Sequence, residues 1–319
     1  MAIVTNTYLT FDQKGIRENL SDIIYQISPE ETPFMSSAGK EKAESTFFEW
    51  QQDALASAAA NAVVEGNDYA STATAAVATT RIGNYCQISS KNVLVSGTSD
   101  AVKKAGRKKE MAYQLAKLSA EIKRDMEFTC LSNIAAVAGN SSTARKTGTL
   151  MAFLKTNVNM GTGAAATPVY TTFPNDVRTD GTTRAFTEAI LKSAIATVWA
   201  SGGVPKLLSL GGTQKQVASA FTGIAETRFD VGGAKASTII GAADVYVSDF
   251  GNVSIVPNRY QRNRDAFLLD PEFVSIAYLR PFQTVDLAKT GDAEKKLLLA
   301  EWGLKVKAES ALGVIADLT

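Results

Sequence analysis

The feature that most constrains the fold is a tract of small side chains between two strand-like segments. Residues 54–80, ALASAAANAVVEGNDYASTATAAVATT, have no amphipathic period and contain several turn residues, which predicts an extended loop. Residues 45–51 (STFFEWQ) before it alternate with the period of a strand, as do residues 81–95 after it. Two strands joined by so long a loop predict a hairpin that projects from the body, and compact domains retain such loops for a function.

A long helix is predicted next. Ser99 and Asp100 are suitable N-cap residues, and the helical pattern runs from about residue 101 to about residue 136. Its apolar stripe consists of Met111, Leu115, Leu118, Ile122 and Met126. At about 1.5 Å per residue the helix would be roughly 50 Å long, longer than a small domain. Such a helix is expected to act as a spine for other elements.

The rest of the chain mixes helices and strands without regular strand–helix–strand alternation. Helices are expected at about 187–200 and 214–221, and strands at 206–210, 245–247, 253–256, 267–269, 274–279 and 302–308. This order predicts the α+β class.

The chain of 319 residues contains no histidine. This excludes Ser–His and Cys–His nucleophilic pairs, HExxH zinc sites and imidazole bases. Any catalysis would depend on carboxylates or lysines, so we predict that the protein is not an enzyme and has no catalytic residue, metal or cofactor. Cys86 and Cys130 lie far apart in no metal-ligand spacing and are expected to be buried, reduced thiols.

Charge and hydropathy argue against several partners. The formal net charge of +1 creates no strong field toward nucleic acid or an acidic membrane. The N-terminal residues do not have the pattern of a secretory signal, and no apolar run is long enough to cross a bilayer. We therefore expect a soluble protein made in a cytoplasm, with no membrane partner.

Short motifs are better explained by structure than by chemistry. Residues 161–166 (GTGAAA) match a dinucleotide fingerprint loosely, but Thr167-Pro168 follows where a helix should begin, so a loop is expected. Residues 210–215 (LGGTQK) lack the P-loop spacing, and residues 37–40 (SAGK) fit only a short SxxK pattern. The carboxylates that could be catalytic or ligating are Asp244, Asp249 and Asp265, each beside a predicted strand end or turn, where Asp is common.

Two basic clusters stand out. The first, at the start of the predicted spine helix, consists of Lys103, Lys104, Arg107, Lys108 and Lys109. Cations there oppose the helix dipole, so DNA phosphates or carboxylates of a neighbouring chain could lie opposite, although a solvated face is the default. The second contains Arg259, Arg262 and Arg264 and could contact nucleic acid, another subunit or only solvent.

The order of elements and several strings resemble one protein family. A half-apolar N-terminal arm that cannot bury itself (LSDIIYQISPEETPF, 20–34) precedes the hairpin strand FFEWQQDAL (47–55). Further strings are VSDFGNVSIVPNR (247–259) and FLLDPEFVSIAYLRPFQTVDLAKTGDAEKKLLLAEWGLKVKAESALGVI (267–315). Together they resemble the major capsid proteins of tailed bacteriophages, which have the Hong Kong 97-like fold.

The resemblance implies a division of the chain. Residues 1–40 would be the N-terminal arm, 41–98 the E-loop, 99–186 the P-domain with the spine helix, 187–285 the A-domain, and 286–319 the return to the P-domain. It also implies that Phe34 and its arm neighbours are buried only against adjacent subunits. The expected inter-subunit contacts are Ile23, Ile24, Tyr25, Phe34, Phe47, Trp50, Lys103, Lys104, Arg107, Arg259, Arg262 and Arg264.

This sequence differs in two ways from some members of the family, and each difference leads to an expectation. Residues 54–80 contain no lysine. The covalent cross-link that some such capsid proteins form between a loop lysine and an asparagine of a neighbouring subunit is therefore not expected here. An isopeptide-linked ladder on a denaturing gel would contradict this expectation. The arm begins close to Met1, so any scaffold is expected to be a separate protein. A mature N-terminus well inside the chain would contradict that expectation.

The resemblance implies a protein that self-assembles into hexamers and pentamers of an icosahedral head shell around double-stranded DNA. Expected partners are copies of itself, a portal, scaffold or decoration proteins, and DNA without sequence preference, in a virion assembled in the host cytoplasm. The alternatives are a nanocompartment shell of the encapsulin type, another virion structural protein, or, in a different class, a hydrolase using Asp244 or Asp249.

Overall fold

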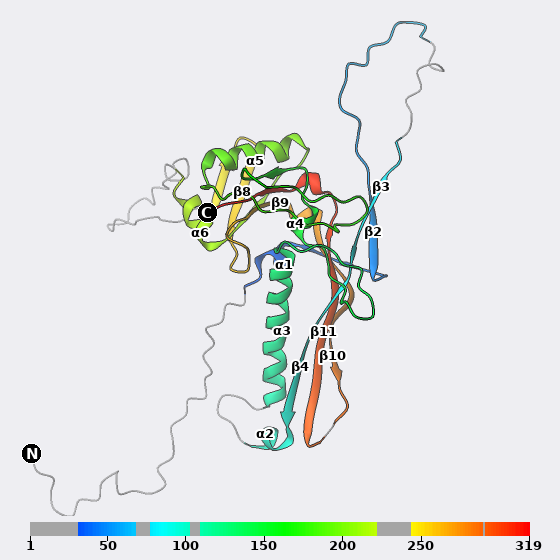
Figure 1. The fold of residues 1–319 in the computed structure, drawn as a ribbon, viewed down its shortest axis with the longest axis vertical. Helices are drawn as coiled ribbons and strands as arrows, with labels where there is room; N and C mark the ends of the chain where they lie inside the picture. Colours follow the sequence, from blue (N-terminus) through cyan, green and yellow to red (C-terminus); the bar gives the residue numbers. More distant parts are fainter. Residues whose placement is uncertain (1–30, 68–76, 103–108, 222–243, 290) are drawn as a thin grey trace, which may run out of the picture.

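Long strands and one helix form the elongated part of the molecule. The computed structural model describes residues 31–67, 77–102, 109–221, 244–289 and 291–319. The strands, in sheet order, are β1 (Gly39–Lys42), β10 (Val274–Asp286), β11 (Ala293–Val306) and β4 (Gln87–Ser96). β1 runs parallel to β10, and the other pairs are antiparallel. The helix α3 (Glu110–Cys130) lies along β4 and β11 (Figure 1).

The spine helix is shorter than the sequence predicts. α3 has 21 residues, about 32 Å at ~1.5 Å per residue. It is preceded by a separate short helix, α2 (Gly97–Ala101), and the backbone at Val102 and Lys109 is extended rather than helical. The predicted single helix over 101–136 is therefore wrong at both ends. Its apolar stripe faces inward, because Met111, Ile122 and Met126 are buried and Leu115 and Leu118 are half-buried.

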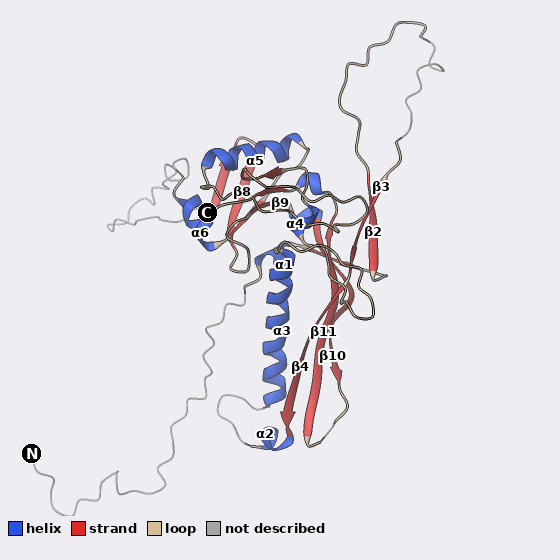
Figure 2. Ribbon diagram, in the orientation of Figure 1, coloured by secondary structure: helices blue, strands red, loops and turns tan. Residues whose placement is uncertain are grey.

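The second sheet has six strands and forms a broader body. In sheet order the strands are β5 (Val158–Asn159), β12 (Gly313–Ile315), β9 (Ala266–Leu269), β6 (Leu207–Leu210), β8 (Gly251–Pro257) and β7 (Val245–Ser248). The helix α5 (Glu188–Ala200) covers one face of this sheet (Figure 2). Short helices complete the fold, namely α1 (Pro33–Ser37), α4 (Leu150–Phe153), α6 (Gly212–Ser219), η1 (Pro271–Phe273) and η2 (Glu309–Ala311).

The projecting hairpin is confirmed. β2 (Phe47–Gln52) pairs antiparallel with β3 (Thr80–Tyr85). The described residues of the intervening loop, 53–67 and 77–79, form no regular helix or strand and extend well beyond the body (Figure 1). The predicted strand 81–95 is divided at Cys86, because β3 pairs with β2 whereas β4 pairs with β11.

The two sheets divide the chain differently from the expected domain limits. Residues 274–285, expected in the A-domain, belong to β10 of the four-stranded sheet, and β12 near the C-terminus lies in the six-stranded one. The larger apolar core joins α1, α3 and the four-stranded sheet to one face of β9 and β12. The smaller core lies beneath α5. The helices predicted at 187–200 and 214–221 and the strands predicted at 206–210, 245–247, 253–256 and 267–269 are confirmed within about two residues. The predictions 274–279 and 302–308 were too short, because β10 continues to Asp286 and β11 already begins at Ala293.

Candidate assembly surfaces

At the root of the projecting hairpin, aromatic rings of β2 lie against two glycines, Gly83 of the partner strand β3 and Gly303 of β11 in the body. A Cβ on Gly303 would lie 2.5 Å from Phe48 Cε1, and one on Gly83 would lie 2.6 Å from Phe47 Cζ. Only a residue without a side chain lets the aromatic rings approach the backbone so closely. The amide of Gly83 also donates to Thr172 O at 2.8 Å. The hairpin is thus fixed to the body at its base.

Phe47 and Trp50, expected to contact neighbouring subunits, lie at this base. The Phe47 ring centroid is 4.6 Å from that of Tyr85, and Trp50 is 6.0 Å from Phe153 of the larger core. Both side chains are half-buried by their own chain. Contact of their remaining surface with another subunit stays a prediction.

The loop beyond the base of the hairpin carries apolar side chains that are largely exposed to solvent. Leu55 is 99% exposed, Val64 75% and Val77 85%. These values are high for large aliphatic residues, and the residues follow one another along one projecting segment. Exposed apolar surface of this extent is typical of interaction sites, and a contact of this loop with another molecule stays a prediction.

A second uncovered apolar surface lies on the four-stranded sheet. Lys91 of β4 faces α3, because its Nζ lies 3.1 Å from Glu121 and 2.9 Å from Asp125. Strand alternation then directs Ile88 and Leu94 to the opposite face, and they are 49% and 59% exposed. Neighbouring apolar residues near the end of β10, Val285 and Leu287, are 38% and 36% exposed.

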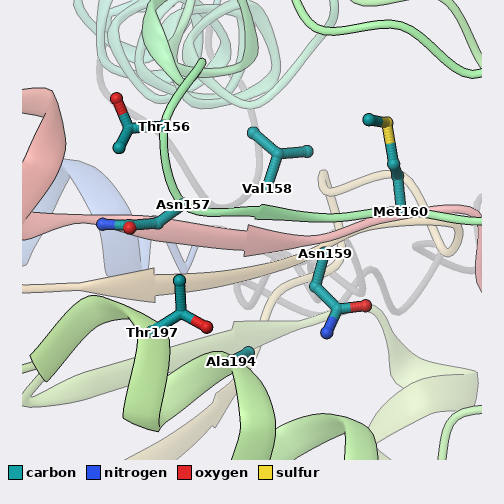
Figure 3. Close-up of a pocket in the computed structure, with 7 residues that line it drawn as sticks. All are labelled: Thr156, Asn157, Val158, Asn159, Met160, Ala194 and Thr197. Atoms are coloured by element: carbon teal, nitrogen blue, oxygen red, sulfur yellow. The ribbon is translucent and has the colours of Figure 1, made fainter. Parts of the chain in front are cut away.

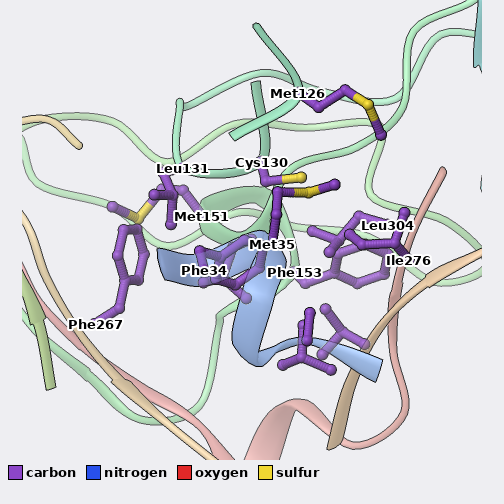
Figure 4. Close-up of a cluster of buried hydrophobic side chains, with 14 of the residues drawn as sticks. Phe34, Met35, Met126, Cys130, Leu131, Met151, Phe153, Phe267, Ile276 and Leu304 are labelled. Atoms are coloured by element: carbon purple, nitrogen blue, oxygen red, sulfur yellow. The ribbon is translucent and has the colours of Figure 1, made fainter. Parts of the chain in front are cut away.

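Phe34 corrects an expectation about the arm. Its side chain is 2% exposed and lies in the larger core of its own chain, with Met35, Cys130 and Phe153 close by (Figure 4). The expectation that it is buried only against adjacent subunits is therefore wrong: α1 docks on α3 within one chain. Ile23, Ile24 and Tyr25 lie outside the described residues.

The buried carboxylate of Glu127 on α3 holds α1 in place. Its Oε1 accepts the amide of Phe34 at 2.8 Å, and its Oε2 accepts that of Met35 at 2.7 Å. Asn258 Nδ2 donates to Oε1 at 2.5 Å. Burial raises the pKa of Glu127, while these three hydrogen bonds act in the opposite direction.

The second basic cluster is turned largely inward. Arg262 contacts Asp180 at 2.5 Å and Asp265 at 3.2 Å, and Arg264 contacts Asp317 at 3.0 Å. Both side chains thus pair with carboxylates of their own chain but keep part of their surface exposed, and their contact with another subunit stays a prediction. Arg259 is exposed and stays a predicted contact. Lys103, Lys104 and Arg107 lie outside the described residues.

Asp317 organises this inward network. Its carboxylate accepts the amides of Gly161 at 3.0 Å and Gly181 at 2.8 Å and also pairs with the buried Arg178. Burial alone would raise the pKa of Asp317, but these donors outweigh it and lower the pKa. In Asp265, by contrast, burial raises the pKa to about 6 despite the nearby Arg262. These hydrogen bonds and ion pairs hold the chain near Asp317 against the loop around Gly181.

The carboxylates considered for catalysis do not converge. Asp244 and Asp249 lie at opposite ends of β7, about 15 Å apart by strand geometry, and both are exposed. Asp244 pairs with Lys215 at 3.3 Å. Asp265 is buried beside Arg262. The geometry gives no acid–base pair from these residues.

A cavity of about 290 Å³ lies between β5 and α5 (Figure 3). Its lining has no titratable side chain and consists of Thr156, Asn157, Val158, Asn159, Met160, Ala194 and Thr197. Within the described ranges, no cluster of three or more acidic or cysteine side chains is arranged to hold a metal ion. In the same ranges, no helix combines the length and apolar character that crossing a bilayer requires.

A comparison with protein families assigns the chain. The family model described as "SU10 major capsid protein" matches residues 3–319. The chain belongs to this family. Membership of the SU10 major capsid protein family confirms the resemblance to phage capsid proteins and the prediction that the chain is not an enzyme. The major capsid protein of Escherichia phage Phieco32 is 41% identical over 127 residues, which are 39% of this chain and 35% of that protein. The match thus spans about a third of that relative's length.

Solved structures confirm the fold of this SU10-type chain. The Cyanophage A-1(L) capsid asymmetric unit has a TM-score of 0.68 at 13% identity, covering 95% of this chain and 97% of that one. The capsid of a native GTA particle has a TM-score of 0.61 at 11% identity, covering 97% and 98%. The SrpI encapsulin complex from Synechococcus elongatus PCC 7942 has a TM-score of 0.54 at 12% identity, covering 95% and 92%. At these identities the likeness concerns the fold, and it confirms the α+β Hong Kong 97-like prediction.

Sequence reasoning missed the two carboxylates that organise the body, Glu127 and Asp317. Their donors lie far away in the chain, at positions 34, 35, 161, 178 and 181. The one available signal for Glu127 was its position next to Met126 on the apolar stripe, where a charge would need partners.

Proposed function

We propose that this protein is the subunit of an icosahedral phage head shell, which it builds by assembling with copies of itself into hexamers and pentamers around packaged double-stranded DNA. The observation that carries the proposal is the projecting loop, whose Leu55, Val64 and Val77 are at least three-quarters exposed in the single chain. Burying such side chains against a neighbouring molecule would contribute about 25 cal/mol per Å².

The outer face of the four-stranded sheet is a matching surface. Ile88 and Leu94 lie there, opposite α3, and are about half exposed. A loop of one subunit laid over this face in the next would cover both surfaces. Many such contacts, each of modest strength, add up when a shell closes.

The remaining expectations are part of the same proposal. Residues 1–40 act as the arm and 41–98 as the E-loop. β10 belongs with α3 in the P-domain rather than with the A-domain, and β11 lies in the segment that returns to the P-domain. The partners are further copies of the chain, a portal, scaffold or decoration proteins, and DNA, and the location is the virion. Arg259 and the basic residues at 103, 104 and 107 are candidate contacts to neighbours or to DNA.

A nanocompartment shell is the second candidate, favoured by the structural likeness to the SrpI encapsulin complex. Both candidate functions predict closed particles, so the molecules enclosed in the particles distinguish one function from the other. Nucleic acid and phage structural proteins inside particles support the head shell, whereas a co-purifying enzyme supports the nanocompartment.

A charge in the loop tests the proposal. Val64→Asp places a carboxylate on a 75% exposed side chain, so the unfolding free energy of the subunit should change by no more than about 0.5 kcal/mol. Asn61→Asp adds the same charge three residues earlier, at another exposed position. Electron microscopy should show that Val64→Asp reduces particles far more than Asn61→Asp. Equal assembly by both variants and the wild type would contradict the role of the loop.

A further inference from the structure

Where the N-terminal arm joins the body, a buried carboxylate binds the first backbone amides of α1. α1 begins with Pro33, and its N-cap residue Thr32 makes no side-chain hydrogen bond to the helix. The first amides of a helix have no partner within the helix and need one from outside. Glu127 supplies it, through one oxygen to Phe34 and the other to Met35. The cap comes from a residue more than ninety positions away in sequence.

The same carboxylate also reaches the six-stranded body. Asn258 follows β8, and its Nδ2 donates to Glu127 Oε1 at 2.5 Å. The orientation of this amide is fixed, because Asn258 Oδ1 already accepts the amide of Tyr260 at 2.9 Å. Asn258 N donates to Leu210 O at 2.7 Å, which ties the residue to the end of β6. Glu127 therefore connects the arm root, the spine helix and the sheet beneath α5.

The charge of Glu127 is balanced by these donors. The side chain is fully buried, and in the described part of the chain no lysine or arginine lies within ion-pair distance of it. A carboxylate so placed is stable only while its hydrogen-bond donors remain in position. Displacement of α1 would remove two of the three donors, so the junction favours one arrangement of arm root and body.

We propose that Glu127 is the positioning residue that sets the direction in which the N-terminal arm leaves the subunit, and that it thereby fixes the geometry of the assembled shell. The inference rests on the proposed function. The arm is a contact to neighbours only if the protein forms a shell, and an arm that leaves in variable directions would join neighbours at variable angles.

Glu127→Gln tests this inference in the full chain. The amide keeps one acceptor oxygen but turns an N–H₂ group toward the second backbone amide. We expect hydrogen exchange at Phe34 and Met35 to accelerate about tenfold or more, the factor that one charge-assisted hydrogen bond represents. Particles should form with an altered diameter or as open sheets and tubes.

Glu309→Gln is the matched control. Glu309 also accepts two consecutive backbone amides, those of Lys155 at 3.3 Å and Thr156 at 3.2 Å. It lies on η2, and these hydrogen bonds go to the segment after α4 rather than to α1. This variant should accelerate exchange at Lys155 and Thr156, leave Phe34 and Met35 unchanged, and assemble into particles of wild-type diameter.

Wild-type particle geometry in Glu127→Gln, with or without faster exchange at Phe34, overturns the inference. If Glu127→Gln does not fold, Asn258→Ala decides: it removes one donor, and unchanged exchange at Phe34 together with wild-type particles overturns the inference. If the wild-type chain itself forms no particles, the proposed function fails and the shell role of Glu127 fails with it, while the exchange data still report whether Glu127 anchors α1.

Discussion

The buried carboxylate of Asp265 makes the stability of the subunit depend on pH in an unusual direction. Burial raises its pKa from 3.8 to about 6. Between these values the folded chain retains a proton that the unfolded chain has released, so stability falls as pH rises through this window. At 1.36 kcal/mol per pKa unit, the loss amounts to about 3 kcal/mol by pH 7. Asp265→Asn removes the titration, and Arg262 retains Asp180 as a partner at 2.5 Å.

The assay is urea unfolding of unassembled subunits of the wild type and Asp265→Asn at several pH values. The unfolding free energy of the variant minus that of the wild type should increase by about 2.4 kcal/mol between pH 4 and pH 7, because the change has already begun at pH 4. Other titrating groups cancel in this difference. A difference that stays constant, or that decreases with rising pH, would show that Arg262 and its neighbours hold Asp265 ionised and would refute the reasoning.

Three further changes test the packing of one chain. Phe34→Ala removes a ring that is 2% exposed and should lower the unfolding free energy by about 3–5 kcal/mol; a loss seen only in assembled particles would restore the expectation that Phe34 contacts neighbours. Gly303→Ala brings a Cβ within 2.5 Å of Phe48 and should cost about 1–3 kcal/mol in urea unfolding, whereas Gly212→Ala meets open space and serves as control. In Glu41, burial is outweighed by bonds from Lys305 and Lys307, which lower its pKa to about 2. Glu41→Gln should therefore destabilise the subunit at neutral pH and lose that effect as pH falls from 4.5 toward 2; an effect independent of pH would argue against those bonds.

Local patterns were sufficient for part of the fold. The alternation in residues 45–51 and 81–95, with the small residues between them, predicted the projecting hairpin because strand and loop preferences depend on neighbouring residues. The helix predicted at about 187–200 is likewise present, as α5. Features whose stability depends on distant partners were not predicted.

The helix α1 shows why. With five residues it is too short to show an apolar period, and it exists because Glu127 caps it and the core receives Phe34. The inward direction of Arg262 and Arg264 was also not predictable, since their carboxylate partners lie at positions 180 and 317. The length of α3 was overestimated because a pattern of polar and small residues does not reveal where the backbone becomes extended.

The central claim is that this chain builds a closed shell. The most direct measurement is negative-stain electron microscopy of the purified full chain, expressed alone and with a candidate scaffold, together with a mass measurement of the particles. The account predicts closed polyhedral particles, or hexameric and pentameric capsomers. A monomer or dimer under every condition tested would contradict it.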